Sequence, residues 1–347
     1  MPSSAPSRLR VAVIGCGAVT ERYHLPALLA SPDVEISALV DPAIERARLL
    51  AARAGASAVL STHQELPRGI NLAVVAVPNA YHEPVASELL RRGIHVLVEK
   101  PMARSVAECD AMLSAAASNG ALLAIGHDFR HFPVARYAHD LFRAGLLGPV
   151  QRVDVRQSSG LGWPAVSDAV LARESGGGIL MDFGIHILDL LLWWLGDLRV
   201  LTYGDDAAGG VESECECELA LTSGAPVRID LSRTRALHDT VIVECERGSV
   251  ELGVFDPAVI RLSAPGLPAL DGMLSDPEFE GAPMRTIFGR QLDDLVTAIR
   301  QGRQPLVPGA QGRRAVALVE DCYRARQPLR YPWDFPNAYA FLAGRDR

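Results

Sequence analysis

Three titratable side chains stand out because largely apolar sequence surrounds them. Asp182, His186 and Asp189 are spaced i, i+4 and i+7 in a segment that begins with three glycines and is otherwise rich in isoleucine and leucine. If this segment is helical, the three side chains share one face. Because isolated buried charge is costly, we interpret this face as a site in which His186 moves a proton, Asp182 lies beside it and Asp189 orients it. A structural Asp–His pair that pins the helix is the alternative.

Lys100 is the second candidate for proton chemistry. It lies between Glu99 and Pro101, directly after an apolar run that reads as a strand. Ligands of open α/β sheets bind beyond the carboxyl ends of strands, and the proline restricts Lys100 to an extended backbone. Lysine and histidine are common proton acceptors when hydride moves between a carbon and a nicotinamide. A surface lysine at a strand end is the alternative.

Two further residues are candidates for substrate contacts. Arg130 lies in a polar segment near the middle of the chain, which we expect at a domain junction, and an interdomain salt bridge is its alternative role. Trp163 follows two glycines and is suited to stacking on a sugar ring. Its alternative role is that of an apolar loop anchor.

A glycine-rich loop near the start of the chain indicates dinucleotide binding. Gly15 supplies the tight turn and Gly17 the close approach to a pyrophosphate, while the helix that follows, with Ala18 and Val19 at its start, offers amide donors and a positive dipole end. Thr20 stands where a third glycine is usual, so the strict pattern is broken. A simple tight strand–helix turn is the alternative.

Asp41 carries the expected cofactor preference. It ends the second predicted strand, about 20 residues past the loop, where an acidic side chain holds the ribose hydroxyls and repels a 2′-phosphate. NAD is therefore the expected cofactor, and the nearby Arg46 and Arg48 leave NADP open. The same aspartate also suits the N-cap of the next helix.

Strands and helices alternate in the first third of the chain, which favours a doubly wound α/β domain. Apolar runs typical of a covered parallel sheet predict strands at 9–14, 35–40, 72–77, 95–99 and 122–126, with helices at 18–30, 43–54, 83–91 and 106–117. We therefore expect an N-terminal Rossmann domain over residues 1–126.

The rhythm changes after residue 126, where strands of alternating polarity predominate. Strands are predicted at 150–158, 200–203, 214–221, 227–233, 240–246, 249–254 and 259–263, with helices at 133–144, 184–195, 285–300 and 311–326. Alternation of this kind is typical of an antiparallel sheet with one face solvated or used for association. We expect residues 127–347 to form a substrate-binding and oligomerisation α+β domain with an open, mainly antiparallel sheet.

Composition excludes several classes of protein. A formal net charge of -7 without a basic block argues against nucleic acid and anionic lipid as partners, and no apolar run reaches the roughly 18 residues of a membrane span. Six cysteines without CxxC pairs or zinc-like spacing are expected to be buried and reduced. We expect a cytoplasmic protein with no metal site.

Taken in order, these motifs resemble the glucose–fructose oxidoreductase, inositol dehydrogenase and rhizopine catabolism family, Gfo/Idh/MocA. The resemblance covers most of the chain and rests on segments 15–17, 24–28, 77–82, 99–101, 130–133, 176–189 and 312–315. It implies that Lys100, Asp182 and His186 form the catalytic set, with Asp182 and His186 also contacting substrate. It also implies cofactor contacts from the first loop, Asp41 and the two later strand ends, namely Pro78, Asn79, His82, Glu99 and Lys100.

The resemblance further implies a reaction and an assembly. We expect an NAD(P)-dependent dehydrogenase or ketoreductase that acts on a hydroxyl or keto carbon of a sugar, cyclitol or related polyol. A non-catalytic nucleotide or sugar sensor and an NAD-recycling glycosidase of the same fold are the alternatives. A homodimer or homotetramer through the C-terminal sheet is expected, and the tail 331–347 lies outside the family pattern.

Overall fold

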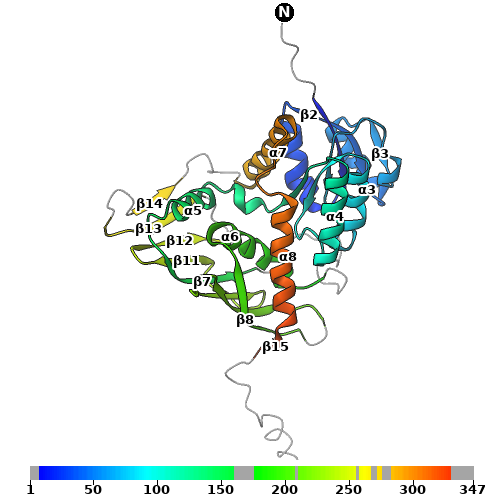
Figure 1. Ribbon diagram of the computed structural model, residues 1–347. Coiled ribbons are helices and arrows are strands. Elements are labelled where there is room, and N and C mark those ends of the chain that lie inside the picture. Colours follow the sequence, from blue (N-terminus) through cyan, green and yellow to red (C-terminus); the bar gives the residue numbers. More distant parts are fainter. Residues whose placement is uncertain are drawn as a thin grey trace, which may run out of the picture.

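The chain forms two sheets with helices packed around them (Figure 1). The computed structural model describes residues 8–159, 176–207, 210–254, 258–266, 272–275 and 283–329. Trp163 and the tail 331–347 therefore lie outside the described residues. Both sheets agree with the expected fold class, an N-terminal Rossmann domain followed by a mainly antiparallel α+β region.

The N-terminal sheet has six parallel strands in the order β3-β2-β1-β4-β5-β6. Its strands are β1 (Leu9–Ile14), β2 (Val34–Val40), β3 (Ala58–Leu60), β4 (Leu72–Val75), β5 (His95–Glu99) and β6 (Leu123–Gly126). The order reverses between β1 and β4, and dinucleotides bind beyond the carboxyl ends of strands at such a reversal. The glycine loop after β1, Pro78 after β4 and Lys100 after β5 all follow strands at this edge.

Helices and short turns connect these strands. They are the π-helical turn η1 (Thr20–His24), η2 (His63–Glu65), η3 (Asn79–Tyr81), α1 (Leu25–Ala30), α2 (Ile44–Ala54), α3 (His82–Arg91) and α4 (Val106–Ser118). The central strands β1, β4 and β5 are almost fully buried, as expected when helices cover both faces of a parallel sheet.

The second sheet has nine strands in the order β14-β13-β12-β11-β7-β10-β9-β8-β15. They are β7 (Val150–Ser158), β8 (Leu198–Asp205), β9 (Glu214–Leu221), β10 (Pro226–Ser232), β11 (Thr240–Cys245), β12 (Gly248–Gly253), β13 (Val259–Ser263), β14 (Gly272–Ser275) and β15 (Arg326–Pro328). Its pairings are antiparallel except for β7 with β10 and β8 with β15. One face packs on helices, and the other carries the charged members of each alternating strand.

Six helical elements are described in the second half of the chain. They are η4 (Asp128–His131), α5 (Pro133–Ala144), the π-helical turn η7 (Leu180–Gly184), α6 (Ile185–Leu195), α7 (Pro283–Gln301) and α8 (Gly309–Arg324). Helix α8 packs against both α4 and α6, so it joins the two halves (Figure 1).

Helix α7 belongs by packing to the N-terminal half. Its Leu292, Leu295 and Val296 complete the apolar cluster formed by β1, β2 and α1, and Arg300 pairs with Asp33 at 2.6 Å. A division at residue 126 separates the two sheets, but α7 comes after that residue and packs with the N-terminal half.

Candidate active site

Lys100 and Asp182 meet although 82 residues separate them. Lys100 Nζ donates to Asp182 Oδ1 and to the Asp182 backbone oxygen, each at 2.8 Å. Lys100 follows β5 and its peptide bond to Pro101 is cis, while Asp182 lies in η7 at the start of the apolar helix. The structure thus brings together two of the three residues that the sequence predicted as the catalytic set.

Arg233 is a second cation on Asp182, and the sequence analysis did not assign it to the site. Its Nη2 donates to Asp182 Oδ2 at 2.7 Å, and its side chain is 5% exposed. Burial alone would raise the pKa of Asp182, but Lys100 and then Arg233, by charge and hydrogen bonding, lower it below its usual value. Both carboxylate oxygens are therefore engaged and the carboxylate is held ionised.

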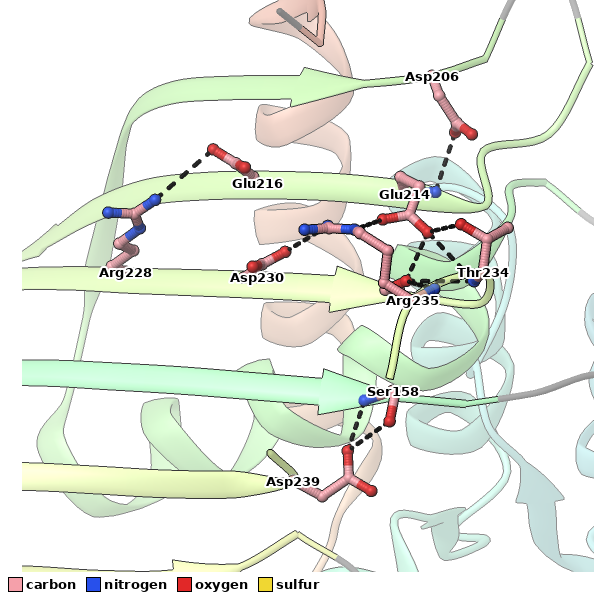
Figure 2. Close-up of polar contacts among 10 residues, drawn as sticks. Ser158, Asp206, Glu214, Glu216, Arg228, Asp230, Thr234, Arg235 and Asp239 are labelled. Atoms are coloured by element: carbon pink, nitrogen blue, oxygen red, sulfur yellow. Dashed lines mark hydrogen bonds and ion pairs between the residues drawn. The ribbon is translucent and has the colours of Figure 1, made fainter. Parts of the chain in front are cut away.

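The loop that carries Arg233 is fixed by a buried carboxylate at the start of β9 (Figure 2). Glu214 accepts hydrogen bonds from Ser232, Thr234 and Arg235, the last at 2.6 Å from Nε. The Arg233 amide donates to the Ser213 carbonyl oxygen at 2.8 Å. Because these contacts lie on both sides of Arg233 in the chain, the guanidinium is presented to Asp182 from a rigid turn.

The beginning of the helix formed by η7 and α6 is fixed by close backbone approach. The Glu212 backbone oxygen accepts from the Ile179 amide at 3.0 Å, and its Oε1 accepts from the Leu180 amide at 3.1 Å and from the Tyr323 hydroxyl at 2.7 Å. A Cβ at Gly178 would lie 2.0 Å from the Glu212 oxygen, so only glycine fits there. A carboxylate at a helix start is also favoured by the helix dipole.

His186 lies in α6 beside Asp128, not beside Asp189. Its Nδ1 is 3.4 Å from Asp128 Oδ1, and its ring stacks on Phe129 at 4.4 Å between centroids. Burial, and then the charge of Lys100, lowers the pKa of His186 well below its usual value. Burial and the charge of Glu99 raise the pKa of Asp128 to about 7. The neutral imidazole is thus the resting form, as a proton acceptor requires.

Asp189 instead binds Arg130, which corrects two predictions. Arg130 Nε and Nη2 each donate to the Asp189 carboxylate at 2.7 Å, and both side chains are 1% exposed. Asp189 therefore does not orient His186, because its oxygens are committed to the guanidinium. Arg130 has no exposed surface for a substrate, and its salt bridge lies within the region after residue 126. It is therefore not the interdomain salt bridge that was the alternative either.

The glycine loop has the shape that a pyrophosphate requires. Gly15 has φ of 95°, and a Cβ there would lie 2.3 Å from the Ala76 oxygen, whereas a Cβ at Gly17 would meet nothing within 4 Å. Thr20, at the position of the third glycine, is buried and donates its hydroxyl to the Gly15 carbonyl oxygen at 2.7 Å. The loop thus fits a dinucleotide, with Gly17, Ala18 and Val19 partly exposed where the helix begins.

Asp41 closes the loop from the end of β2. Its Oδ2 accepts from the Cys16 amide and its Oδ1 from the Ala43 amide, both at 2.8 Å. The carboxylate therefore fixes the loop and the start of α2 together and retains lone pairs for ribose hydroxyls. Arg48 pairs with Glu45 on the surface of α2.

The other predicted cofactor residues separate into two kinds. Pro78 and Asn79 lie in the exposed turn after β4 and remain predicted cofactor contacts. His82 is buried, with Nδ1 2.7 Å from the Pro101 oxygen and Nε2 2.9 Å from the Val77 oxygen. No ring nitrogen of His82 is left for a cofactor, so we correct its role to that of a link between two loops.

Glu99 also has internal partners. Its Oε1 is 2.7 Å from His24 Nε2, and its Oε2 accepts from the Lys100 amide at 3.2 Å. Burial opposes ionisation, but the His24 hydrogen bond and the charge of Lys100 hold the pKa of Glu99 below its usual value. Glu99 thus positions Lys100, and its predicted contact with a cofactor stays a prediction.

The described residues contain neither a metal-site cluster nor a membrane-spanning helix. No group of three or more His, Cys, Asp or Glu side chains there has the arrangement of a metal site. No described helix is both long and apolar enough to cross a membrane.

Fold and site define a two-part α/β protein with a Rossmann dinucleotide-binding unit and a Lys–Asp–His constellation. The family model for the "Oxidoreductase family, NAD-binding Rossmann fold" matches residues 9–127, and the "GFO/IDH/MocA C-terminal domain" matches residues 135–251. The chain belongs to the Gfo/Idh/MocA family, which confirms the resemblance and its NAD-binding domain.

Known proteins place the chain among oxidoreductases. It is 33% identical over 195 residues, 55% of this chain and 56% of its relative, to dTDP-3,4-didehydro-2,6-dideoxy-alpha-D-glucose 3-reductase of Streptomyces violaceoruber. The first such relatives are matched over only about half to two thirds of their own length.

Solved structures match over nearly the whole chain. Aldose-aldose oxidoreductase from Caulobacter crescentus, complexed with glycerol, superimposes with a TM-score of 0.80 at 27% identity, over 92% of this chain and 97% of that one. GenD2 from gentamicin A biosynthesis, in complex with NAD, gives 0.79 at 28%, over 93% and 95%.

Proposed function

We propose that this protein is an NAD(P)-dependent oxidoreductase that interconverts a hydroxyl and a keto group on a sugar, cyclitol or related polyol. The observation that carries the proposal is the contact between Lys100 and Asp182 beside a neutral, buried His186. The relatives support it because they are named as sugar reductases and oxidoreductases. The proposal that the substrate is a sugar or a related polyol rests on the names of these relatives and not on the geometry of the site.

The residues divide the work of proton transfer and orientation. Bound nicotinamide supplies or accepts the hydride, so the chain itself has to position the substrate oxygen and move one proton. His186 takes the hydroxyl proton in oxidation, because its neutral ring is a ready acceptor. Asp182 keeps lone pairs beyond those that Lys100 and Arg233 occupy, so it accepts a hydrogen bond from a substrate hydroxyl. Lys100 stabilises negative charge that develops on the reacting oxygen.

NAD is the proposed cofactor, and Asp41 is the reason. A carboxylate beside the glycine loop suits free ribose hydroxyls and repels a 2′-phosphate. The contact of Asp41 with the Cys16 amide supports this position. Arg46 is half-buried in the first turn of α2. If the protein prefers NADP to NAD, Arg46 is the residue that we expect to bind the 2′-phosphate.

Assembly and location are also proposals. The uncovered face of the second sheet carries mixed charges, including Arg152, which pairs with Asp154 at 3.2 Å and Glu244 at 3.0 Å, and Arg228 facing Glu216 (Figure 2). We propose that this face joins two copies into a homodimer or a pair of dimers. All six cysteines are free and buried, which supports a reducing compartment such as the cytoplasm.

The test is nicotinamide absorbance during incubation with NAD or NADP and a panel of sugars, sugar acids and inositols. We expect turnover with NAD on at least one polyol and a loss of about 100-fold or more in His186→Ala, because general base catalysis contributes roughly that factor. His63→Ala, in the pair with Glu88 between η2 and α3, is the matched control and should match the wild type.

Other outcomes would contradict the proposal. Tight NAD binding without turnover on the whole panel would favour a sensor. Hydrolysis of glycosides without net NADH would favour an NAD-recycling glycosidase.

A further inference from the structure

A buried carboxylate faces the candidate base from outside the catalytic helix. Asp128, in η4, is 5% exposed and approaches His186 Nδ1 to 3.4 Å. That nitrogen is buried and makes no hydrogen bond within the described residues. We propose that Asp128 is the positioning residue and proton partner of His186, so that the pair forms a dyad that carries the single proton of the reaction. The catalytic part of this inference rests on the proposed function.

The other acidic side chains near His186 are already engaged. Asp182 is bound by Lys100 and Arg233, and Asp189 by Arg130. The amides of Asp128 itself and of Phe129 donate to its carboxylate, and within the described residues no lysine or arginine forms an ion pair with it. Asp128 is therefore the carboxylate left to pair with the imidazole, and the Phe129 stack holds the ring in a plane that keeps Nδ1 toward it.

The dyad moves a proton without charging the buried ring. In oxidation the substrate O–H bond breaks and its proton binds Nε2, while the Nδ1 proton passes to the Asp128 carboxylate. In reduction the Nε2 proton goes to the substrate oxygen, and the Asp128 hydroxyl returns its proton to Nδ1. Both electrons travel with the hydride, so the dyad transfers protons only. Asp128 releases its proton to solvent water after oxidation and takes one up from water after reduction.

The electrostatics of the pair favour this exchange. Burial lowers the pKa of His186 and raises that of Asp128 to about 7, so an imidazolium–carboxylate pair is disfavoured. Glu99 raises the pKa of Asp128 and Lys100 lowers it, while Lys100 and His127 lower that of His186. The two groups therefore share one proton near neutral pH.

Nitrogen-15 NMR of histidine-labelled protein tests the dyad without any substrate. The His186 signal is assigned by its loss in His186→Ala. As pH rises, we expect the ring to change from the Nε2–H to the Nδ1–H tautomer with a midpoint near pH 7, and to remain neutral throughout. Asp128→Asn should abolish the change. Asp140→Asn, which alters the exposed pair with His139 at 3.0 Å, is the matched control and should preserve it.

Two results would overturn the dyad. One is a single His186 tautomer between about pH 5.5 and 8.5 in the wild type, and the other is ordinary charging of the ring to imidazolium. Because the wild-type titration decides the matter, the inference does not depend on whether Asp128→Asn folds.

Turnover separates a proton partner from a merely structural residue. With any substrate found in the panel, we expect Asp128→Asn to lower kcat by about tenfold or more, to lose the limb of the pH profile near 7, and to keep the KM for NAD within about twofold. An unchanged limb would contradict the catalytic part of the inference. Failure of the panel with a normal NMR titration would count against the proposed function alone.

Discussion

A single carboxylate between two cations sets the ionisation of the site. The lowered pKa of Asp182 means that its ionised form is stabilised in the folded protein. The stability it contributes is present above the unfolded pKa near 4 and is lost as pH falls through the lower folded value. Together, Lys100 and Arg233 outweigh the burial that would raise this pKa.

Replacing Arg233 should therefore move the acidic limb of activity. In Arg233→Gln we expect the pKa of Asp182 to rise, so the low-pH limb of kcat/KM shifts upward by about one unit. A pH series of initial rates measures the shift. Arg324→Gln, at the exposed C-terminal end of α8, is the control, and an equal shift in both variants would mean that Arg233 does not act through Asp182.

Sequence reasoning identified the residues on the helix and the strand end but not their partners. The i, i+4 spacing placed Asp182 and His186 together, and the strand end placed Lys100. Arg233 and Asp128 reach the site from 51 residues after Asp182 and 58 residues before His186, respectively. No local period encodes such contacts. In the sequence, Asp128 is distinguished only by its place in the polar segment that also contains Arg130.

At the scale of elements, the helix formed by η7 and α6 depends on a glycine that allows close contact between two backbone segments. We expect Gly178→Ala to destabilise the protein by about 1–3 kcal/mol, as overpacking does, and to lower kcat because η7 and Asp182 shift. Urea unfolding and initial rates measure both effects. Gly210→Ala, where a Cβ would meet nothing within 4 Å, should be neutral, and equal stability of the two variants would exclude a tight start of the helix.

Element prediction worked where the apolar period was long. Helix α5 and strands β1, β7, β9 and β13 have the predicted bounds, because burial of one face dictates their pattern. The short edge strands β3, β14 and β15 were missed, since three or four residues carry too little period. The predicted helix at 18–30 begins as the π-helical turn η1, which periodicity does not distinguish from an α-helix.

For the whole molecule, α7 makes the two halves interdependent. Leu295 is 1% exposed in the N-terminal cluster, so Leu295→Ala should cost about 2–5 kcal/mol. All four tryptophans lie after residue 126, so their fluorescence reports the second half while NADH binding reports the first. In Leu295→Ala we expect the native tryptophan fluorescence and NADH binding to be lost at the same temperature, which should be lower than in the wild type. Leu201→Ala, 45% exposed, is the control, and separate transitions would mean independent halves.

The position of α7 also has a consequence for the order of synthesis. The first sheet leaves the ribosome complete by residue 126, but the helix that covers its β1–β2–α1 cluster arrives about 170 residues later. At roughly 5–20 residues per second, the nascent sheet waits on the order of 10–30 s with Leu25, Leu28 and Ile36 uncovered on that side. Until α7 is synthesised, the nascent Rossmann domain therefore exposes this apolar cluster, which is the kind of surface that chaperones bind.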